Sequence, residues 1–262
     1  MEILITLDNI TKSYDEKCVL DHITLDLYKA QSIAFTGHNG CGKSTMLKLI
    51  AGLIRLSSGK IVHHKKIRFS FVPEKFPGMN IRMNDYLGSI AAMEEVDRSV
   101  VDGLVKDFFL ESMINNKLNE LSKGSLQKVG VIQALLGKHD VILLDEPLSG
   151  QDAASQDVFI EKINELRSHG VTILMSCHER RLIDELTDKE YSIHNGKLYC
   201  KESEEDYLYK IFVKKNDSLT AWPEMTDHGN KRMLQVKAAE LKETVLRLYS
   251  EGWEITVIEE YL

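Results

Sequence analysis

The sequence predicts an α/β fold built around a mostly parallel sheet. Two short, continuous apolar runs, residues 141–144 and 171–175, have the length and composition of strands buried on both faces. An amphipathic helical pattern over residues 158–168 lies between them, and Gly170 ends it. Alternation of strand and helix is typical of a parallel sheet covered by helices, so we expect this arrangement for the core.

The segments before this core alternate between strand and helix signals. Residues 3–8 have the period-two pattern of a strand, and residues 80–137 are mostly helical in pattern. A helix over residues 45–51 is stopped by Gly52. The remaining expected elements are strands over residues 18–27, 32–36 and 67–72, and a turn at residues 57–59.

Composition changes after about residue 200, which indicates a second, smaller region. Residues 201–206 are charged and read as a linker. Beyond them we expect a strand over residues 233–236, a helix over residues 240–249 and a strand over residues 253–257, which together make a small βαβ-like appendix. The expected domains are therefore residues 1–200, with a helical subdomain at about 76–137, and residues 201–262.

Bulk properties exclude several classes of protein. The net charge of −7 and the pI near 5.8 argue against a protein that coats nucleic acid. No apolar run approaches the roughly 18–20 residues that span a bilayer, and the first residues lack a basic leader. The four cysteines are scattered without CxxC spacing, which fits a reduced cytoplasmic chain.

A glycine-rich segment between the strand at 32–36 and the helix at 45–51 predicts a phosphate-binding loop. It matches G-x-x-x-x-G-K-[ST] and reads Gly37, His38, Asn39, Gly40, Cys41, Gly42, Lys43, Ser44, Thr45. Glycine lets backbone N–H groups approach phosphates, and the helix adds its positive end. We expect Lys43 to contact the β- and γ-phosphates of ATP and Ser44 to ligate Mg²⁺.

Two carboxylates follow the apolar run at residues 141–144, at the end of the strand where ligands bind in open α/β sheets. Asp145 is a candidate Mg²⁺ ligand. Glu146 is a candidate general base for the attacking water. Read alone, the pair could instead be an acidic helix N-cap, but the phosphate loop favours the nucleotide interpretation.

At this point residues 1 to about 200 resemble the ABC ATPase family, through motifs that are specific in their order and spacing. Three of them are similar to the family's signature, D-loop and switch histidine; they are Ser122, Lys123, Gly124 and Ser125 after Leu121, then Ser149, Gly150, Gln151 and Asp152, then His178. The resemblance implies that Tyr14 stacks on adenine and that His178 contacts the γ-phosphate. Core packing is the alternative for both side chains.

The resemblance also implies partners. In this family a chain cannot place its signature on its own phosphate loop, so a second copy, or a homologous ATPase subunit, is expected to supply Ser122 and Gly124 to each ATP. Ser122 could equally be a plain helix N-cap. An integral membrane transporter subunit on a separate chain is expected to dock near Phe76, Met79 and Tyr86, at the cytoplasmic face of the membrane. No nucleic acid partner is expected.

Four positions depart from the family pattern, and one of them is Ser125, which replaces the signature glutamine. Glu74 stands where the family has a glutamine that follows a strand, and its oxygen is a third candidate Mg²⁺ ligand. Lys123 replaces a signature glycine, and Gln151 replaces a usual leucine. Glu74, Lys123 and the C-terminal appendix are similar to the export-type ATPases, so we expect an ATPase that powers an exporter. The alternatives are an ATPase of an assembly pathway, such as iron–sulfur cluster biogenesis, or a regulatory subunit with weak hydrolysis.

Overall fold

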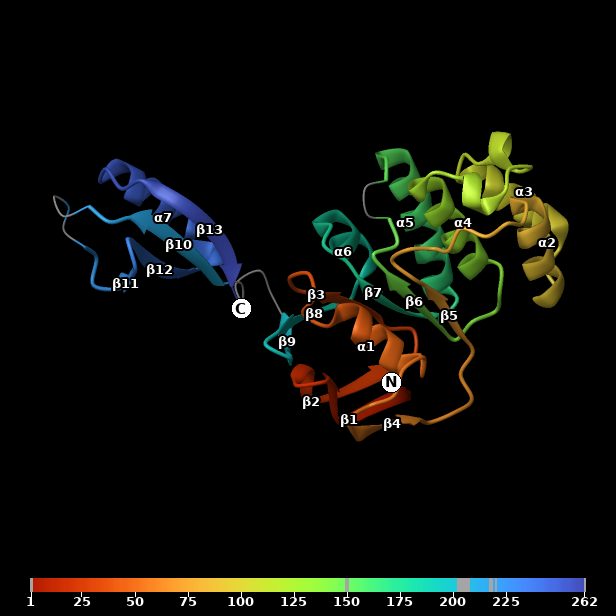
Figure 1. Cartoon of the computed structure of the whole chain (residues 1–262), viewed down its shortest axis with the longest axis horizontal. Helices are drawn as coiled ribbons and strands as arrows, with labels where there is room; N and C mark the ends of the chain where they lie inside the picture. The colour runs from red at the N-terminus through yellow and green to blue at the C-terminus, as the bar shows by residue number, and fades with distance from the viewer. Residues whose placement is uncertain (1, 149–150, 202–207, 217–218, 220, 262) are drawn as a thin grey trace. The chain divides into compact units, whose positions relative to one another are not determined.

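The computed structural model describes residues 2–148, 151–201, 208–216, 219 and 221–261. The chain divides into two units, residues 1–198 and 199–262 (Figure 1). The division lies two residues before the boundary expected from composition. No helix in the described part of the chain is long and apolar enough to cross a membrane.

The first unit contains a six-stranded sheet in the order β5-β6-β7-β3-β8-β9. The first five strands in this order pair in parallel, which confirms the predicted α/β class. Their bounds are β3 Ser32–Thr36, β5 Phe69–Val72, β6 Val141–Asp145, β7 Thr172–Ser176, β8 Lys189–His194 and β9 Lys197–Lys201. Parallel pairing places the carboxyl ends of β5, β6, β7 and β3 at one edge of the sheet, and the functional residues follow these ends.

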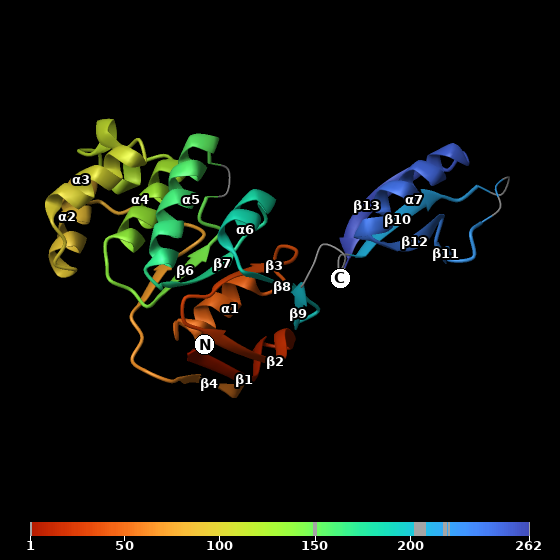
Figure 2. The ribbon, with the colours of Figure 1, turned by 180° about the vertical axis from the view of Figure 1, so that it is seen from behind.

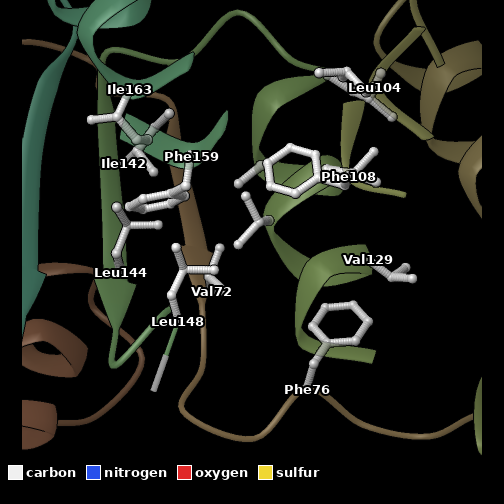
Figure 3. Packing of buried hydrophobic residues seen from close by; sticks show 14 of the residues in the cluster. Val72, Phe76, Leu104, Phe108, Val129, Ile142, Leu144, Leu148, Phe159 and Ile163 are labelled. Carbon is white, nitrogen blue, oxygen red and sulfur yellow. The ribbon is translucent and has the colours of Figure 1, made fainter. Parts of the chain in front are cut away.

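The sheet is buried on both faces, because successive side chains of a strand point to opposite sides. On β6, Ile142 and Leu144 face one core and Leu143 faces the other. Figure 3 shows Phe159 and Ile163 of α5 (Ala153–Ser168) in the first of these cores, against β6. Burial of each such side chain contributes about 1.5–3 kcal/mol, which explains the continuous apolar run in the sequence.

The second core lies between this sheet and an antiparallel sheet of order β2-β1-β4, with bounds β1 Ile3–Tyr14, β2 Lys17–Tyr28 and β4 Ser58–His63. Helix α1 (Lys43–Ile50) lies between the two sheets in both views (Figures 1 and 2). Its Met46, Leu47 and Ile50 are fully buried there. The turn expected at residues 57–59 is wrong in part, since β4 begins at Ser58 and Gly59 (φ +82°) lies within the strand.

Helices cover the other face of the parallel sheet. The segment expected to be helical contains α2 Met83–Met93, α3 Arg98–Asp107, the 3-10 turns η1 Glu111–Met113 and η2 Leu118–Glu120, and α4 Lys123–Leu135, and α6 Arg180–Leu186 follows β7. Helix α4 buries Val129 and Ile132 in the same core as α5. The helical segment therefore shares its core with the sheet and does not form a separate one.

The second unit is a four-stranded antiparallel sheet with one helix. Its bounds are β10 Leu208–Lys214, β11 Thr226–His228, β12 Lys231–Lys237, α7 Ala238–Ser250 and β13 Ile255–Tyr261. The expected strand, helix and strand correspond to β12, α7 and β13, but β10 lies between the two strands in the order β11-β12-β10-β13. The βαβ-like appendix is thus split by a strand that we did not predict. Apart from Lys201, the expected linker lies outside the described residues.

Candidate functional site

A cavity of about 760 Å³ in the first unit is the candidate site. It adjoins the carboxyl ends of β3, β5, β6 and β7, where open α/β sheets bind ligands. Most of its lining comes from the segments that carried the predicted motifs. The lining residues are Val19, Asn39, Gly40, Gly42, Lys43, Ser44, Thr45, Glu74, Lys123, Gly124, Gln127, Glu146, Gln151 and His178.

The phosphate loop is shaped by its glycines. Gly37, Gly40 and Gly42 have φ values of +130°, +80° and +119°, in a region where side chains are strained. A Cβ on Gly42 would lie 2.9 Å from Leu20 Cδ2, because the loop rests on β2. Helix α1 begins directly after it, with no side-chain cap and no acidic residue in its first turn. Its first amides can therefore receive an anion.

Lys43 is only 6% exposed and points along the loop. Its Nζ donates to Gly37 O at 2.8 Å and lies 2.8 Å from His178 Nε2. The same ammonium is 4.0 Å from Glu146 Oε1. Burial, and then the nearby Lys43 charge, lowers the pKa of His178, which favours the neutral imidazole that can accept a hydrogen bond from the Lys43 ammonium.

Glu146 follows β6 in a strained conformation, with φ +49°. Its N–H donates to both Ser176 O (3.1 Å) and Ser176 Oγ (3.0 Å), which holds this turn against the end of β7. Its Oε1 lies 3.2 Å from His178 Nε2. Burial raises the pKa of Glu146, and the charges of Asp145, Glu74 and Glu179 act in the same direction against Lys43. A carboxylate with a raised pKa is a stronger base for water.

Asp145, Ser44 and Glu74 are the predicted Mg²⁺ ligands. Ser44 Oγ donates to Asp145 Oδ1 at 2.8 Å, and Ser176 Oγ donates to the same oxygen at 2.7 Å. Asp145 is 2% exposed and Ser44 is half-buried, and their oxygens are hard donors of the kind that suits Mg²⁺. No group of three acidic, His or Cys side chains among the described residues could hold a metal alone.

The signature residues lie at the start of α4. Ser122 is exposed and caps the helix by accepting the N–H of Ser125 at 3.1 Å. Its Oγ also lies 2.9 Å from Ser125 Oγ. Ser122 does not line the cavity, but Lys123 and Gly124 do. The start of the signature helix and the phosphate loop of one chain thus border one cavity, which the resemblance did not lead us to expect.

The D-loop contacts the same helix end. Gln151 Nε2 donates to Gly124 O at 3.1 Å. Asp152 caps α5 through Ser155 N at 2.9 Å, and its carboxylate is 3.6 Å from Lys128 Nζ on α4. The other two predicted D-loop residues, Ser149 and Gly150, lie outside the described residues.

Some predicted residues lie off the cavity wall. Tyr14 does not line the cavity; it is 48% exposed, and Lys12 Nζ covers its ring at 4.5 Å from the centroid. Gly37, His38 and Cys41 belong to the loop but not to the lining. Cys41 is buried, and a Cβ on Gly37 would lie 2.8 Å from its Sγ.

Sequence reasoning missed three residues that shape the site. Val19 lines the cavity from β2, and Gln127 lines it from α4. Ser176 joins Asp145 and Glu146 through its hydroxyl. A signal existed for Ser176, because it is a hydroxyl residue at the end of an apolar strand. Val19 and Gln127 carry no such signal, since their place depends on how β2 and α4 pack.

A family model described as "ABC transporter" matches residues 20–149. That range begins in β2 and includes the phosphate loop, the Glu74 segment, the signature and the two carboxylates. The match therefore covers most of the elements that border the cavity.

Similar proteins and structures agree with this match. An uncharacterised ABC transporter ATP-binding protein of Methanocaldococcus jannaschii is 30% identical, over 97% of this chain and 94% of that protein. The zinc import ATP-binding protein ZnuC of Vibrio cholerae is 35% identical, over 72% of this chain and 72% of that protein. A solved ATP-binding subunit of an ABC transporter superposes with a TM-score of 0.67 at 25% identity, covering 75% of this chain and 90% of that one.

Proposed function

The chain belongs to the ABC transporter family as an ATPase subunit, and from this premise we propose that two copies share two ATP sites and drive a membrane subunit by closing and reopening. The observation that carries the proposal is the cluster of Lys43, Glu146 and His178 at the strand ends, within 4.0 Å of one another. This cluster unites a phosphate-binding cation, a base and an imidazole in one cavity.

Each side chain has a role that its geometry supports. Lys43 and the loop amides hold the β- and γ-phosphates of ATP. Ser44 and Asp145, with Glu74 from the facing loop, would hold Mg²⁺, which supplies charge neutralisation to the phosphates. Glu146 takes the proton of the attacking water, and His178 holds the γ-phosphate geometry.

The second copy completes each site. Ser122 is exposed at the start of α4, so its hydroxyl and the helix amides are accessible to another chain. A twofold pair would place the signature of one copy over the phosphate loop of the other. ATP would favour the closed pair and hydrolysis would release it, which couples chemistry to motion.

The membrane subunit requires a docking surface, and the patch expected from the sequence needs correction at one of its three residues. Phe76 is 8% exposed and packs in the core, beside Val129 in Figure 3. A neighbouring cavity of about 210 Å³ lies between β5 and α2 and is lined by Phe69, Phe71, Ile90, Met93 and Gln133, among others. Met93 is 71% exposed there. We place the membrane subunit at this groove, on the cytoplasmic side of the membrane.

Export remains the proposed direction of transport. Glu74, Lys123 and the second unit support it, because all three are similar to features of the export-type ATPases. The named zinc importers argue for import, and two of them, from Pseudomonas putida and Pseudomonas entomophila, match 87% of this chain. Transport by inside-out vesicles that hold this chain and its membrane subunit decides the question. ATP-dependent accumulation of substrate inside them supports export, and ATP-dependent loss supports import.

A complementation experiment tests the shared sites. Lys43→Ala removes the phosphate cation, and Ser122→Arg blocks the signature, so each variant alone should lack ATPase activity. In a mixed pair, one site carries both defects and the other carries neither. When equal amounts of the two variants pair at random, about half of the pairs are mixed, and each mixed pair has one intact site of its two. The mixture should therefore recover about a quarter of the wild-type activity.

The same mixture addresses the alternative of a site within one chain. Since Lys123 and Gly124 already border the cavity of their own chain, a self-contained site is a real competitor. In that case the mixture stays as inactive as its components. Wild-type protein mixed with Lys43→Ala serves as the control for subunit exchange.

A further inference from the structure

Gln127 joins α4 to the loop that carries Glu74. Its side chain is 5% exposed. Gln127 Oε1 accepts the Phe76 N–H at 3.2 Å, and Gln127 Nε2 donates to Pro73 O at 2.8 Å. One buried amide thus binds the backbone on both sides of Glu74, which itself is exposed on the cavity wall.

The loop has a second anchor one turn along α4. Residues 73–77 form neither helix nor strand, so no backbone ladder fixes them. The ring of Phe76 instead rests on Gly130, where an added Cβ would lie 2.5 Å from Phe76 Cδ2. Because Gln127 and Gly130 are three residues apart, they are neighbours on the helix surface and form one seat for the loop.

The same helix begins with the signature residues. Gly124 lies one turn before Gln127 and accepts the Gln151 amide. Helix α4 therefore holds the Glu74 loop at one turn and carries the signature at the previous turn. Because the helix is rigid, the position of the loop is linked to the position of the signature.

We propose that Gln127 is a positioning residue, which fixes Glu74 relative to the signature end of α4 so that the loop and the helix move together. The proposal rests on the proposed function, in which Glu74 faces the Mg²⁺ of bound ATP. Gln127 acts through the Pro73 carbonyl and the Phe76 amide and needs no contact with the nucleotide.

The test compares two glutamines whose side chains bind backbone groups. Gln127→Met keeps the side-chain volume but removes both hydrogen bonds. Gln31→Met is the matched control, because Gln31 Oε1 accepts the Tyr28 N–H at 3.3 Å in the turn before β3 and Gln31 does not line the cavity. Thermal unfolding of both variants checks that they are folded.

Two readouts separate positioning from a purely structural role. In the nucleotide-free chain, Gln127→Met should speed hydrogen exchange of the Phe76 amide about tenfold, and Gln31→Met should leave it unchanged. In ATPase assays, Gln127→Met should raise the Mg²⁺ concentration for half-maximal activity about five- to tenfold. The KM for ATP at saturating Mg²⁺ should change less than about twofold, since the phosphate loop is untouched.

A conservative variant and a double variant complete the design. Gln127→Glu keeps an acceptor for the Phe76 N–H but loses the donor to Pro73, so it should preserve the slow exchange of Phe76 while still raising the Mg²⁺ requirement. In a Glu74→Ala background, Gln127→Met should cause no further shift in that requirement, because the residue that it positions is already absent.

Failure of this inference and failure of the proposed function give different results. If the wild-type chain hydrolyses Mg-ATP but Gln127→Met matches Gln31→Met in both readouts, the positioning role is wrong. An equal shift with and without Glu74 also overturns it. If the wild-type chain shows no Mg-dependent ATPase activity, the proposed function fails, and the exchange of the Phe76 amide still reports the anchor.

Discussion

The two halves of the cavity are held in different ways. The phosphate-loop half is a continuous strand, loop and helix whose shape comes from backbone conformation at Gly37, Gly40 and Gly42. The signature half is assembled from separate segments that meet through side chains, with Gln127 on the Glu74 loop and Gln151 on Gly124.

This difference has a functional consequence. A half that is fixed by its own backbone is ready to bind phosphate in a single chain. A half that is joined by a few hydrogen bonds, each worth about 1 kcal/mol, can shift when a ligand or a second copy arrives. We therefore expect substitutions in the first half to affect ATP binding and substitutions in the second to affect turnover.

The largest expected effect comes from the base. Glu146→Gln should lower kcat by about 10²–10⁴-fold while ATP still binds, because the phosphate loop is intact. A dimer should then accumulate with ATP, measured by gel filtration with light scattering. Lys43→Ala is the control, since it should lose both ATP binding and the dimer. A Glu146→Gln chain that stays monomeric in saturating ATP would contradict the proposed cycle.

Gly42→Ala should break the phosphate-loop half. The new Cβ meets Leu20 and would hold a φ of +119° that alanine rarely adopts, so affinity for ATP should fall at least about tenfold. Titration with a fluorescent ATP analogue measures it. Gly103→Ala in α3 is the matched control, because nothing lies within 4 Å of its Cβ. Equal affinities for the two variants would show that the loop is not fixed by its backbone.

Gln151→Leu should affect the signature half alone. It removes the hydrogen bond to Gly124 O and should lower kcat by about two- to fivefold. The affinity of the isolated chain for ATP should remain that of wild type, which the same titration checks. A larger loss of ATP affinity than of kcat would place Gln151 in the phosphate-binding half and remove the distinction between the halves.

Asp97 lies outside both halves of the cavity, and we expect Asp97→Ala to have the smallest effect of these substitutions. Asp97 caps α3, and the hydroxyl and backbone N–H of Ser99 lower the pKa of its carboxyl. Because the pKa of this carboxyl is lower in the folded state, its ionised form stabilises the fold at pH values above the pKa of the unfolded chain. This stabilisation is lost as the pH falls through the pKa of the folded state. The variant should melt about 2 °C lower at pH 7, and the difference should shrink below about pH 4. ATPase activity should be unchanged; a loss would extend the catalytic region to α3.

Local patterns predicted the parallel core well. Apolar runs at β6 and β7 indicated strands buried on both faces, and the glycine motif indicated the loop between β3 and α1. We did not predict strand β10. Its place in the second sheet depends on pairing with β12 and β13, which are distant from it in the sequence. From the sequence we expected Phe76 on the docking surface, but the structure buries it. The ring is buried because Gly130 has no side chain and leaves room for it, and this contact cannot be predicted from a local pattern.

The sequence by itself determined the chemistry of the site: a phosphate loop, two carboxylates at a strand end and a histidine after the next apolar strand. Each of these is a short segment whose residue types and spacing carry the information. Only the tertiary structure decided that Ser176 bridges Asp145 and Glu146, that Gln127 holds the Glu74 loop and that Tyr14 lies off the cavity wall. Such contacts join segments far apart in the chain, and their distances are fixed by packing of the sheet and α4, which no local pattern encodes.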